Sequence, residues 1–313
     1  MAKYLVTGVA GFIGAAIAKR LLGEGHKVVG MDNLSTGHLD HIPQGVVFHE
    51  VGVHEVKVLE ILKNHNFDAI FHIAGQSGGE LSYADPVYDL QSNAQSTLLL
   101  LKYASESGCK KVIYAGTVSI YGDPENSLEI LESEEAKPQS FYGVGKLASE
   151  HYLRIYAKQF GLDTISLRLF NIYGPGQNLD NLQQGMTSIY LSQAVRGKHV
   201  HVKGSKDRFR DLVYIDDTVE AFITVLSDKF KGYNTYNICT GKATTVEKVV
   251  NEIRKNLSFD TSVKYEGSTP GDIFGYTGSP SKFMSESSWK PITNFKDGVK
   301  VMVKWVLKKE AKV

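Results

Sequence analysis

The feature of this sequence that most constrains its fold is a regular alternation of short apolar runs with segments of helix length. The apolar runs are rich in β-branched residues and read KYLVTG, KVVGMD, VVFHEV, AIFHIAG, KKVIYAGT and TISLRLF. Helical segments begin near Ile13 and after Pro86. Such strand–helix units are typical of a parallel sheet with helices on both faces. The alternation therefore predicts an α/β fold with a doubly wound parallel (Rossmann) sheet.

The pattern loosens after the segment NIYGPGQ, and this change predicts a second domain. Residues 1–170 form the expected Rossmann domain. Residues 171–211 and 241–313 are expected to form a smaller, irregular α/β substrate domain, and the chain is expected to return to the first domain around residues 212–240. The sequence contains no internal repeat, long linker or low-complexity tract.

Composition excludes several classes of function. Lys and Arg number 35 against 34 Asp and Glu, so neither a nucleic-acid partner nor a polybasic membrane patch is expected. No apolar stretch approaches the ~20 residues of a membrane span, and the N-terminus lacks a signal-peptide layout. Cys109 and Cys239 suit a reducing compartment, and neither they nor the histidines have metal-ligand spacing. We expect a cytoplasmic protein without a metal.

Three glycines in TGVAGFIG indicate a dinucleotide site. Gly8, Gly11 and Gly14 directly follow a predicted strand and open a predicted helix. Glycine lets the backbone approach a pyrophosphate, which then meets the unpaired N–H groups of the helix N-terminus. Asp32 ends the second strand, where a carboxylate accepts hydrogen bonds from ribose hydroxyls and repels a 2′-phosphate. The pattern favours NAD over NADP, although a purely structural glycine turn is the alternative.

Tyr142 and Lys146 are candidate catalytic residues. They stand four residues apart at the start of a predicted helix, so both side chains share one face. A nearby ammonium group favours the phenolate form of a tyrosine, whose usual pKa of ~10 is too high for a base at neutral pH. Thr117 ends the fifth strand, at the edge where open parallel sheets bind ligands. The alternatives are a surface Tyr beside a solvated Lys, and a Thr that only forms a turn.

These motifs give the chain a close resemblance to a known family. The resemblance rests on TGVAGFIG, MDNLSTG, FHIAG, AGTVSIYG, YGVGK, LRLFNIYGPGQ, RDLVYIDD and a degraded late motif, TPGD. Over nearly its whole length, the chain resembles the extended short-chain dehydrogenase/reductase family, particularly nucleotide-sugar 4-epimerases of the UDP-glucose 4-epimerase type. The resemblance implies that Thr117, Tyr142 and Lys146 form a catalytic trio with NAD as cofactor.

Two residues after Thr117 narrow the implied reaction. Family 4,6-dehydratases carry Asp-Glu where this chain has Val118 and Ser119. Related decarboxylases carry Glu, and 3,5-epimerase/reductases Cys, at the position of Ser119. What remains is reversible oxidation at a sugar C4 hydroxyl. This leads to 4-epimerisation if the 4-keto sugar is retained, and to a C4 dehydrogenase or reductase if it is released. An NAD-binding sensor or scaffold without catalysis is a third alternative.

The resemblance also implies a cofactor shell. It comprises Gly8, Gly11, Phe12, Ile13, Gly14, Asp32, Asn33, Ser35, Thr36, Gly37, Gly52, Val53, Ala74, Gly75, Asn93, Tyr142, Lys146 and Phe170. Gly52 is a departure, because relatives usually carry an Asp there that accepts a hydrogen bond from the adenine amino group. We expect its absence to weaken NAD binding by ~1 kcal/mol unless another acceptor replaces it.

The implied substrate is a nucleoside-diphosphate sugar. Its expected shell comprises Gln76, Ser77, Thr117, Ser119, Asn171, Arg208, Arg210 and Tyr276. Relatives that use UDP-sugars carry a second phosphate-binding Arg where this chain has Thr269, so Arg208 or Lys206 is a candidate replacement and GDP or dTDP stays open. There are alternatives to these binding roles: Arg210 pairs with Asp211, and Asn171 is a turn residue.

Weaker features concern the sugar and the assembly. Tyr276 matches a position where a bulky ring excludes N-acetyl sugars, and Glu80 disfavours a uronate. In the family, the helices near residues 90–103 and 142–160 pack as the four-helix bundle of a homodimer. The alternative is that the apolar stripes on these two helices pack against the core of a single chain.

Overall fold

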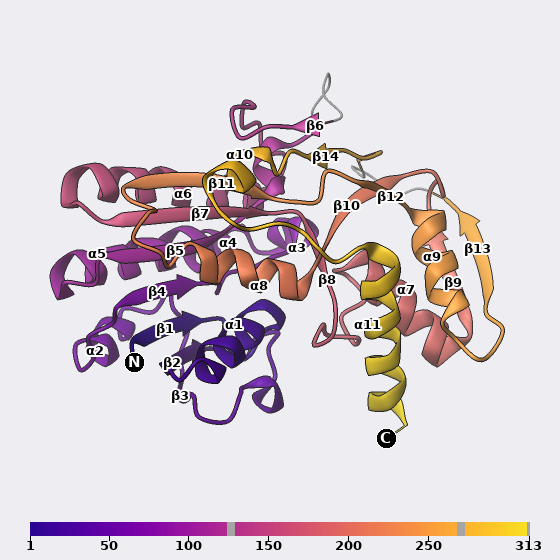
Figure 1. The fold of residues 1–313 in the computed structure, drawn as a ribbon, viewed down its shortest axis with the longest axis horizontal. Coiled ribbons are helices and arrows are strands. Elements are labelled where there is room, and N and C mark those ends of the chain that lie inside the picture. Colours follow the sequence, from indigo (N-terminus) through magenta and orange to yellow (C-terminus); the bar gives the residue numbers. More distant parts are fainter. Residues whose placement is uncertain (124–128, 268–272, 312–313) are drawn as a thin grey trace.

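The computed structural model describes residues 1–123, 129–267 and 273–311, and its centre is a seven-stranded sheet (Figure 1). The strand order is β11-β7-β5-β4-β1-β2-β3, and every neighbouring pair is parallel. In chain order the strands are β1 (Lys3–Thr7), β2 (Lys27–Asp32), β3 (Val47–Glu50), β4 (Ala69–His72), β5 (Lys111–Thr117), β7 (Asp163–Leu169) and β11 (Tyr233–Ile238). The predicted doubly wound parallel sheet is confirmed.

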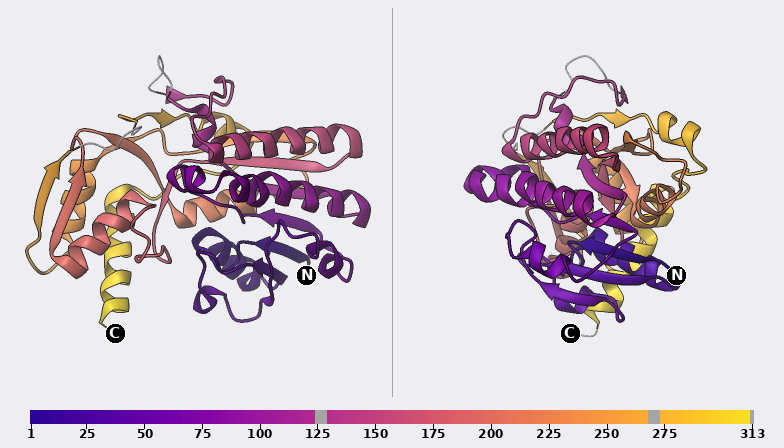
Figure 2. Two further views of the ribbon diagram at one scale, coloured as in Figure 1. Left: turned by 180° about the vertical axis from the view of Figure 1, so that it is seen from behind. Right: turned by 90° about the vertical axis from the view of Figure 1, so that its left-hand side faces the viewer.

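Helices cover both faces of this sheet, as the two further views show (Figure 2). They are α1 (Phe12–Gly23), α2 (Val58–Leu62), α3 (Gly79–Ala84), α4 (Pro86–Leu90), α5 (Ser96–Ser107), α6 (Phe141–Phe160) and α8 (Ile215–Thr224). Helix α1 packs beside α8, whereas α4 and α5 pack beside α6. A single π-helical turn, Gln91–Gln95, joins α4 to α5.

Most of the remaining elements lie beyond the carboxyl ends of the main strands, whereas the helix Ser281–Glu286 packs against β11 (Figure 1). Strands β8 (Asn171–Tyr173), β10 (Phe209–Tyr214) and β12 (Ala243–Thr245) form one small sheet. The two other sheets pair β9 (His199–Lys203) with β13 (Ser262–Glu266), and β6 (Glu129–Ile130) with β14 (Thr277–Gly278). The remaining helices are α7 (Met186–Ser192), α9 (Val246–Lys255), α10 (Ser281–Glu286) and α11 (Phe295–Glu310).

The chain crosses between the two regions more than once. Strand β10 belongs to a small sheet, and α8 then lies beside α1 of the main sheet. Strand β11 pairs with β7 at the edge of the main sheet, after which β12 returns to β10. The division at residues 170, 211 and 240 stays a prediction.

Apolar burial joins the two regions. One core cluster runs from the face of the main sheet beneath α1 and α8 into the small sheets, α9 and α11, and a second lies on the opposite face beneath α2 and α5. Trp289 is buried, and its indole N–H donates to the Asp217 carbonyl of α8 at 2.7 Å. Within the described ranges, no helix is long and apolar enough to cross a bilayer.

Candidate active site

The glycine turn between β1 and α1 has no room for side chains at two of its positions. Gly8 has φ +69°, and a Cβ built on it would lie 2.9 Å from the Ala74 nitrogen. A Cβ on Gly14 would clash with the Gly8 carbonyl oxygen. Gly11 precedes α1 with extended backbone and no side chain to cap the first N–H groups. The turn thus leaves an open cradle at a helix N-terminus, which fits a dinucleotide pyrophosphate.

Asp32 lies beside this cradle, at the end of β2. Its side chain is almost fully buried, and its two oxygens accept from the backbone N–H of Ala10 at 3.0 Å and of Leu34 at 2.8 Å. Burial raises the pKa of the carboxyl group, whereas the hydrogen bonds from Leu34 and Ala10 lower it. Each carboxylate oxygen keeps a second lone pair, so Asp32 can also accept from a ribose hydroxyl.

A carboxylate lies close to Gly52, the position that departs from the family pattern. The Gly52 N–H donates to Glu55 Oε1 at 2.7 Å, and a Cβ on Gly52 would lie 2.8 Å from that oxygen. The other Glu55 oxygen pairs with Lys57 at 2.8 Å. Val53 is buried beside it. Glu55 is not among the residues expected from the sequence, because only the fold of this turn brings its side chain back to Gly52.

Thr117, Tyr142 and Lys146 come together at the carboxyl end of β5. Thr117 ends that strand, and its hydroxyl accepts from the Ser119 N–H at 3.2 Å, so it closes a turn as well as facing the site. Ser140 caps α6 by accepting from the Gly143 N–H, which places Tyr142 and Lys146 in the first two turns. Thr117 also acts on the Tyr142 side chain and lowers the pKa of its phenol.

The ammonium group of Lys146 is buried among these residues. Its Nζ donates to the Ala115 carbonyl at 3.0 Å and lies 5.9 Å from the centre of the Tyr142 ring. It also lies 4.7 Å from the centre of the Tyr114 ring. The structure therefore excludes the alternative of a solvated surface lysine.

Burial dominates the protonation equilibria of the trio. It raises the pKa of Tyr142 to about 12, while the hydrogen bond from Thr117 lowers this pKa and the charge of Asp89 raises it. Burial lowers the pKa of Lys146 from 10.5 to about 8, while the charges of Asp89 and Glu150 raise it. Protein groups alone thus make Tyr142 a weaker acid than a free phenol, so a further positive charge is needed to favour the phenolate.

Gly75 and Asn93 form a second cradle beside Lys146. Gly75 has φ +154°, and a Cβ on it would clash with Asn93 Oδ1 and lie 3.4 Å from Lys146 Nζ. Asn93 Nδ2 donates to the Gln76 carbonyl at 3.1 Å. Asn93 Oδ1 is buried without a hydrogen-bond partner. An unpartnered buried acceptor beside an ammonium group and a bare backbone fits the nicotinamide end of a dinucleotide.

The candidate substrate residues lie on β8 and β10. Asn171 begins β8 and donates from Nδ2 to the Asp211 carbonyl at 3.3 Å, so it is a strand residue rather than a turn residue. Arg210 Nη1 donates to the carbonyls of Phe209 and Ile273 at 2.8 and 3.0 Å. The buried Asp211 carboxylate instead accepts from Thr240, Gly241 and Gly278. An Arg210–Asp211 ion pair is therefore excluded.

Arg208 lies two residues before Arg210, just ahead of β10. Its guanidinium folds over the turn between β9 and β10 and donates to the carbonyls of Lys203 and Ser205. Burial raises the pKa of Tyr190, whereas the positive charges of Arg208 and Arg210 lower it. Lys206 is exposed and pairs with Glu247 at 2.9 Å. Thr269 lies outside the described residues.

The other expected contacts lie at the edges of the same region. The rings of Phe170 and Tyr276 meet edge to face, with centroids 6.3 Å apart. Ser77 Oγ donates to Gln184 Oε1 at 3.1 Å, and Gln184 Nε2 donates to the Ser77 carbonyl at 2.8 Å. This pair joins the loop after β4 to the loop before α7. Phe12, Ile13 and Gly37 are half-buried, whereas Asn33, Ser35 and Thr36 are exposed.

Comparisons with known proteins decide the family. Residues 4–239 match the NAD dependent epimerase/dehydratase family. The chain belongs to this family. It is therefore an NAD-dependent enzyme of the extended short-chain dehydrogenase/reductase type. This excludes the alternative of a non-catalytic sensor or scaffold.

Solved structures and curated relatives match nearly the whole enzyme. The UDP-glucose 4-epimerase of Thermotoga maritima, solved with UDP-glucose, is 30% identical with a TM-score of 0.93, covering 98% of this chain and 99% of that chain. The UDP-glucose 4-epimerase of Thermus thermophilus, solved with NAD, is 31% identical with a TM-score of 0.89, at 97% and 98% coverage. A dTDP-4-dehydro-6-deoxyglucose reductase of Escherichia coli is 28% identical over 308 residues, 96% of each chain.

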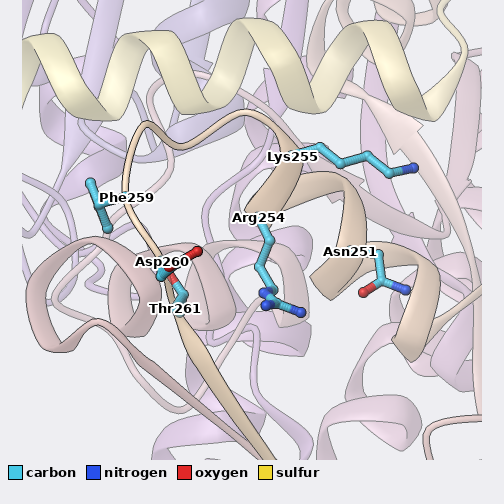
Figure 3. Close-up of a pocket in the computed structure, with 6 residues that line it drawn as sticks. All are labelled: Asn251, Arg254, Lys255, Phe259, Asp260 and Thr261. Carbon is cyan, nitrogen blue, oxygen red and sulfur yellow. The ribbon is translucent and has the colours of Figure 1, made fainter.

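A separate pocket of this epimerase-family chain lies apart from the catalytic trio. It is lined by the end of α9 and the segment before β13: Asn251, Arg254, Lys255, Phe259, Asp260 and Thr261 (Figure 3). Arg254 and Lys255 are exposed, and they stand at a helix C-terminus, where the helix dipole disfavours anions. Among the described residues, no group of three His, Cys, Asp or Glu side chains is arranged to hold a metal ion.

Proposed function

We propose that this protein is a nucleotide-sugar 4-epimerase that acts by transient oxidation at C4. The observation that carries the proposal is the meeting of Thr117, Tyr142 and Lys146 at the carboxyl end of β5, beside the bare backbone of Gly75. A phenol beside a hydroxyl and close to a buried ammonium group is suited to removing a proton from a sugar hydroxyl. Val118 and Ser119 supply no carboxylate for a dehydration.

In the proposed mechanism, Tyr142 is the general base. Thr117 holds the O4 atom of the sugar while the phenolate oxygen of Tyr142 takes the O4 proton. NAD, when bound, accepts the C4 hydride and carries a positive nicotinamide charge that opposes the effect of burial on Tyr142. Lys146 supports the phenolate and holds the nicotinamide ribose. If the 4-keto sugar rotates and presents its opposite face before the hydride returns, Tyr142 gives the proton back and the C4 configuration is inverted.

We assign the diphosphate to Arg210 and Arg208. A diphosphate in a partly buried site needs charge-assisted donors, and the guanidinium fork provides them in pairs. Arg210 lies at the start of β10, next to β8 and Asn171. Arg208 stands near it and is the candidate that replaces the second arginine expected at Thr269. Lys206 is less suited, because it is exposed and paired with Glu247.

The test combines turnover with nucleotide binding. Purified enzyme with NAD is incubated with UDP-glucose, UDP-galactose and the corresponding GDP- and dTDP-sugars, and C4 epimers are separated by chromatography. We expect interconversion of one epimeric pair without accumulation of NADH. Arg208→Ala should sharply weaken binding of that nucleotide sugar and leave NAD affinity unchanged, with Lys206→Ala as the matched control. Efficient UDP-glucose turnover by both wild type and Arg208→Ala would exclude the arginine assignment.

The second candidate is a C4 reductase or dehydrogenase that releases its product. It is favoured by the 28% identity to a dTDP-4-dehydro-6-deoxyglucose reductase over nearly the full length of both chains. The same catalytic trio serves both reactions, since they differ only in whether the 4-keto sugar is retained. Stoichiometric formation of NADH during turnover of a nucleotide sugar, or consumption of added NADH with a 4-keto sugar, would identify this function.

A further inference from the structure

A buried carboxylate behind the catalytic helix has no role in the mechanism described so far. Asp89 lies on α4, and its side chain is 1% exposed. Its Oδ1 accepts from Asn93 Nδ2 at 3.2 Å. A Cβ on Gly145 of α6 would lie 3.3 Å from Asp89 Oδ2. Because Gly145 stands between Tyr142 and Lys146 in the sequence, the carboxylate reaches the catalytic helix through the gap that this glycine leaves.

Burial raises the pKa of the Asp89 carboxyl group, whereas the hydrogen bond from Asn93 and the positive charge of Lys146 lower it, so the charged forms of Asp89 and Lys146 favour each other. Glu150, the other carboxylate that acts on Lys146, is paired with Arg168 at 2.8 Å and accepts from Ser166 at 2.7 Å. Within the described parts of the chain, no cationic nitrogen comes within ion-pair distance of Asp89. A buried carboxylate without a direct ion pair is costly, and the Lys146 ammonium is the charge that offsets part of this cost.

Two other titratable groups face the same site. His72 of β4 is fully buried and bonded to Thr7 and Thr97, and burial lowers its pKa to about 3, so it is neutral. Tyr114 of β5 lies under Lys146, and burial raises its pKa well above the usual value. Neither supplies a charge at neutral pH. The electrostatic balance at Lys146 is therefore decided by Asp89, Glu150 and the proton on Tyr142.

We propose that Asp89 is a positioning residue of the catalytic site, whose buried carboxylate keeps Lys146 in its ammonium form and orients Asn93 against Gly75. The inference rests on the role of Lys146 in the proposed function. Removing the charge lowers the pKa of Lys146, because an anion favours the charged form of an amine. It also lowers the pKa of Tyr142, which the same charge raises. Both limbs of the pH–rate profile should therefore move to lower pH.

The decisive experiment measures the protonation of Lys146 without relying on activity. The free energy of unfolding is measured by denaturant titration from pH 6 to 11 for wild type, Lys146→Met, Asp89→Asn and the double variant. The pKa of Lys146 is lower in the folded protein than in the unfolded chain, so wild type should gain stability relative to Lys146→Met as the pH rises through about 8 towards 10.5. In the Asp89→Asn background this gain should begin about one pH unit lower.

Asn retains the oxygen that accepts from Asn93, so Asp89→Asn removes the charge with little change in shape. Asp89→Ser is a second neutral variant should the Asn amide fit poorly against Gly145. The matched control is Asp85→Asn, which removes an exposed charge at the N-cap of the same helix and should leave the onset unchanged. The alkaline limb of kcat/KM should shift in parallel with stability.

The outcomes separate this inference from the proposed function. A shifted onset of the stability gain supports the role of Asp89, whether or not the enzyme proves to be a 4-epimerase. An onset that is identical in the Asp89→Asn, Asp89→Ser and Asp85→Asn backgrounds overturns it, even if epimerisation is demonstrated. Restoration of the wild-type onset by Asp89→Glu, which returns the negative charge, would add support.

Discussion

At Tyr142, one hydroxyl group is expected to carry the proton transfer. Tyr142→Phe removes that group from a buried ring that is otherwise retained. We expect turnover to fall by ~10²-fold or more, because general base catalysis is lost, with thermal stability little changed. Steady-state rates and thermal melts measure the two effects. A variant that keeps more than about a tenth of the wild-type rate would remove Tyr142 from the base role.

Asp32 is the residue on which cofactor preference should depend. Asp32→Ala removes the ribose acceptor and also the partner of the Ala10 N–H, so a modest loss of stability should accompany it. The preference for NAD over NADP should narrow by about tenfold or more, since hydrogen bonds to a charged group contribute about 1.5–3 kcal/mol. Dissociation constants for both cofactors are the measurement. Wild-type protein that binds NADP as tightly as NAD would contradict the assignment.

At the scale of elements, the turn from β1 into α1 depends on the space around its glycines. Gly14→Ala would place a methyl group against the Gly8 carbonyl oxygen, a backbone atom that cannot rotate away. We expect a loss of about 1–3 kcal/mol in unfolding free energy and a marked loss of NAD affinity. Gly23→Ala, at the other end of α1, meets no atom within 4 Å and is the control. It should be neutral, or stabilising by less than about 1 kcal/mol, with unchanged NAD binding.

At the scale of the whole molecule, helix α6 presents an exposed apolar face. Val144 and Ile155 of α6 are 52% and 48% exposed, and their separation of about three helical turns puts them on one face. An exposed apolar face on this helix agrees with the homodimer bundle that the family resemblance implies. We therefore expect Ile155→Glu to convert a dimer into a monomer in size-exclusion chromatography with light scattering.

The control for this prediction is Ile292→Glu, because Ile292 is 82% exposed and lies between α10 and α11, away from α6. That variant should keep the wild-type mass. A monomeric wild type at micromolar concentration, or an Ile155→Glu variant that stays dimeric, would show that the apolar face of α6 has another role.

Sequence alone determined the main sheet, its covering helices, the glycine turn and the close approach of Thr117 to Tyr142 and Lys146. These follow from short-range patterns: β-branched runs, helical spacing of four residues, and glycines between a strand and a helix. Parallel strands then place their carboxyl ends at one edge, which brings Thr117 to the catalytic helix. The roles of these residues stay predictions, whereas the fold, the family and the NAD dependence are confirmed.

Only the tertiary structure decided which charges surround that site. Asp89 lies beside Gly145 because α4 packs on α6, and its charge acts on Lys146 from there. No spacing in the sequence encodes an approach between residues so far apart. Glu55 lies only three residues from Gly52, but its bond to that N–H depends on how the turn after β3 folds. Arg210 and Asp211 form no ion pair, because neighbouring side chains on a strand face opposite sides. The Asp211 carboxylate instead accepts hydrogen bonds from backbone N–H groups that follow β11 in the chain. Electrostatic effects act through space and burial rather than along the chain, so they become readable only once the fold is known.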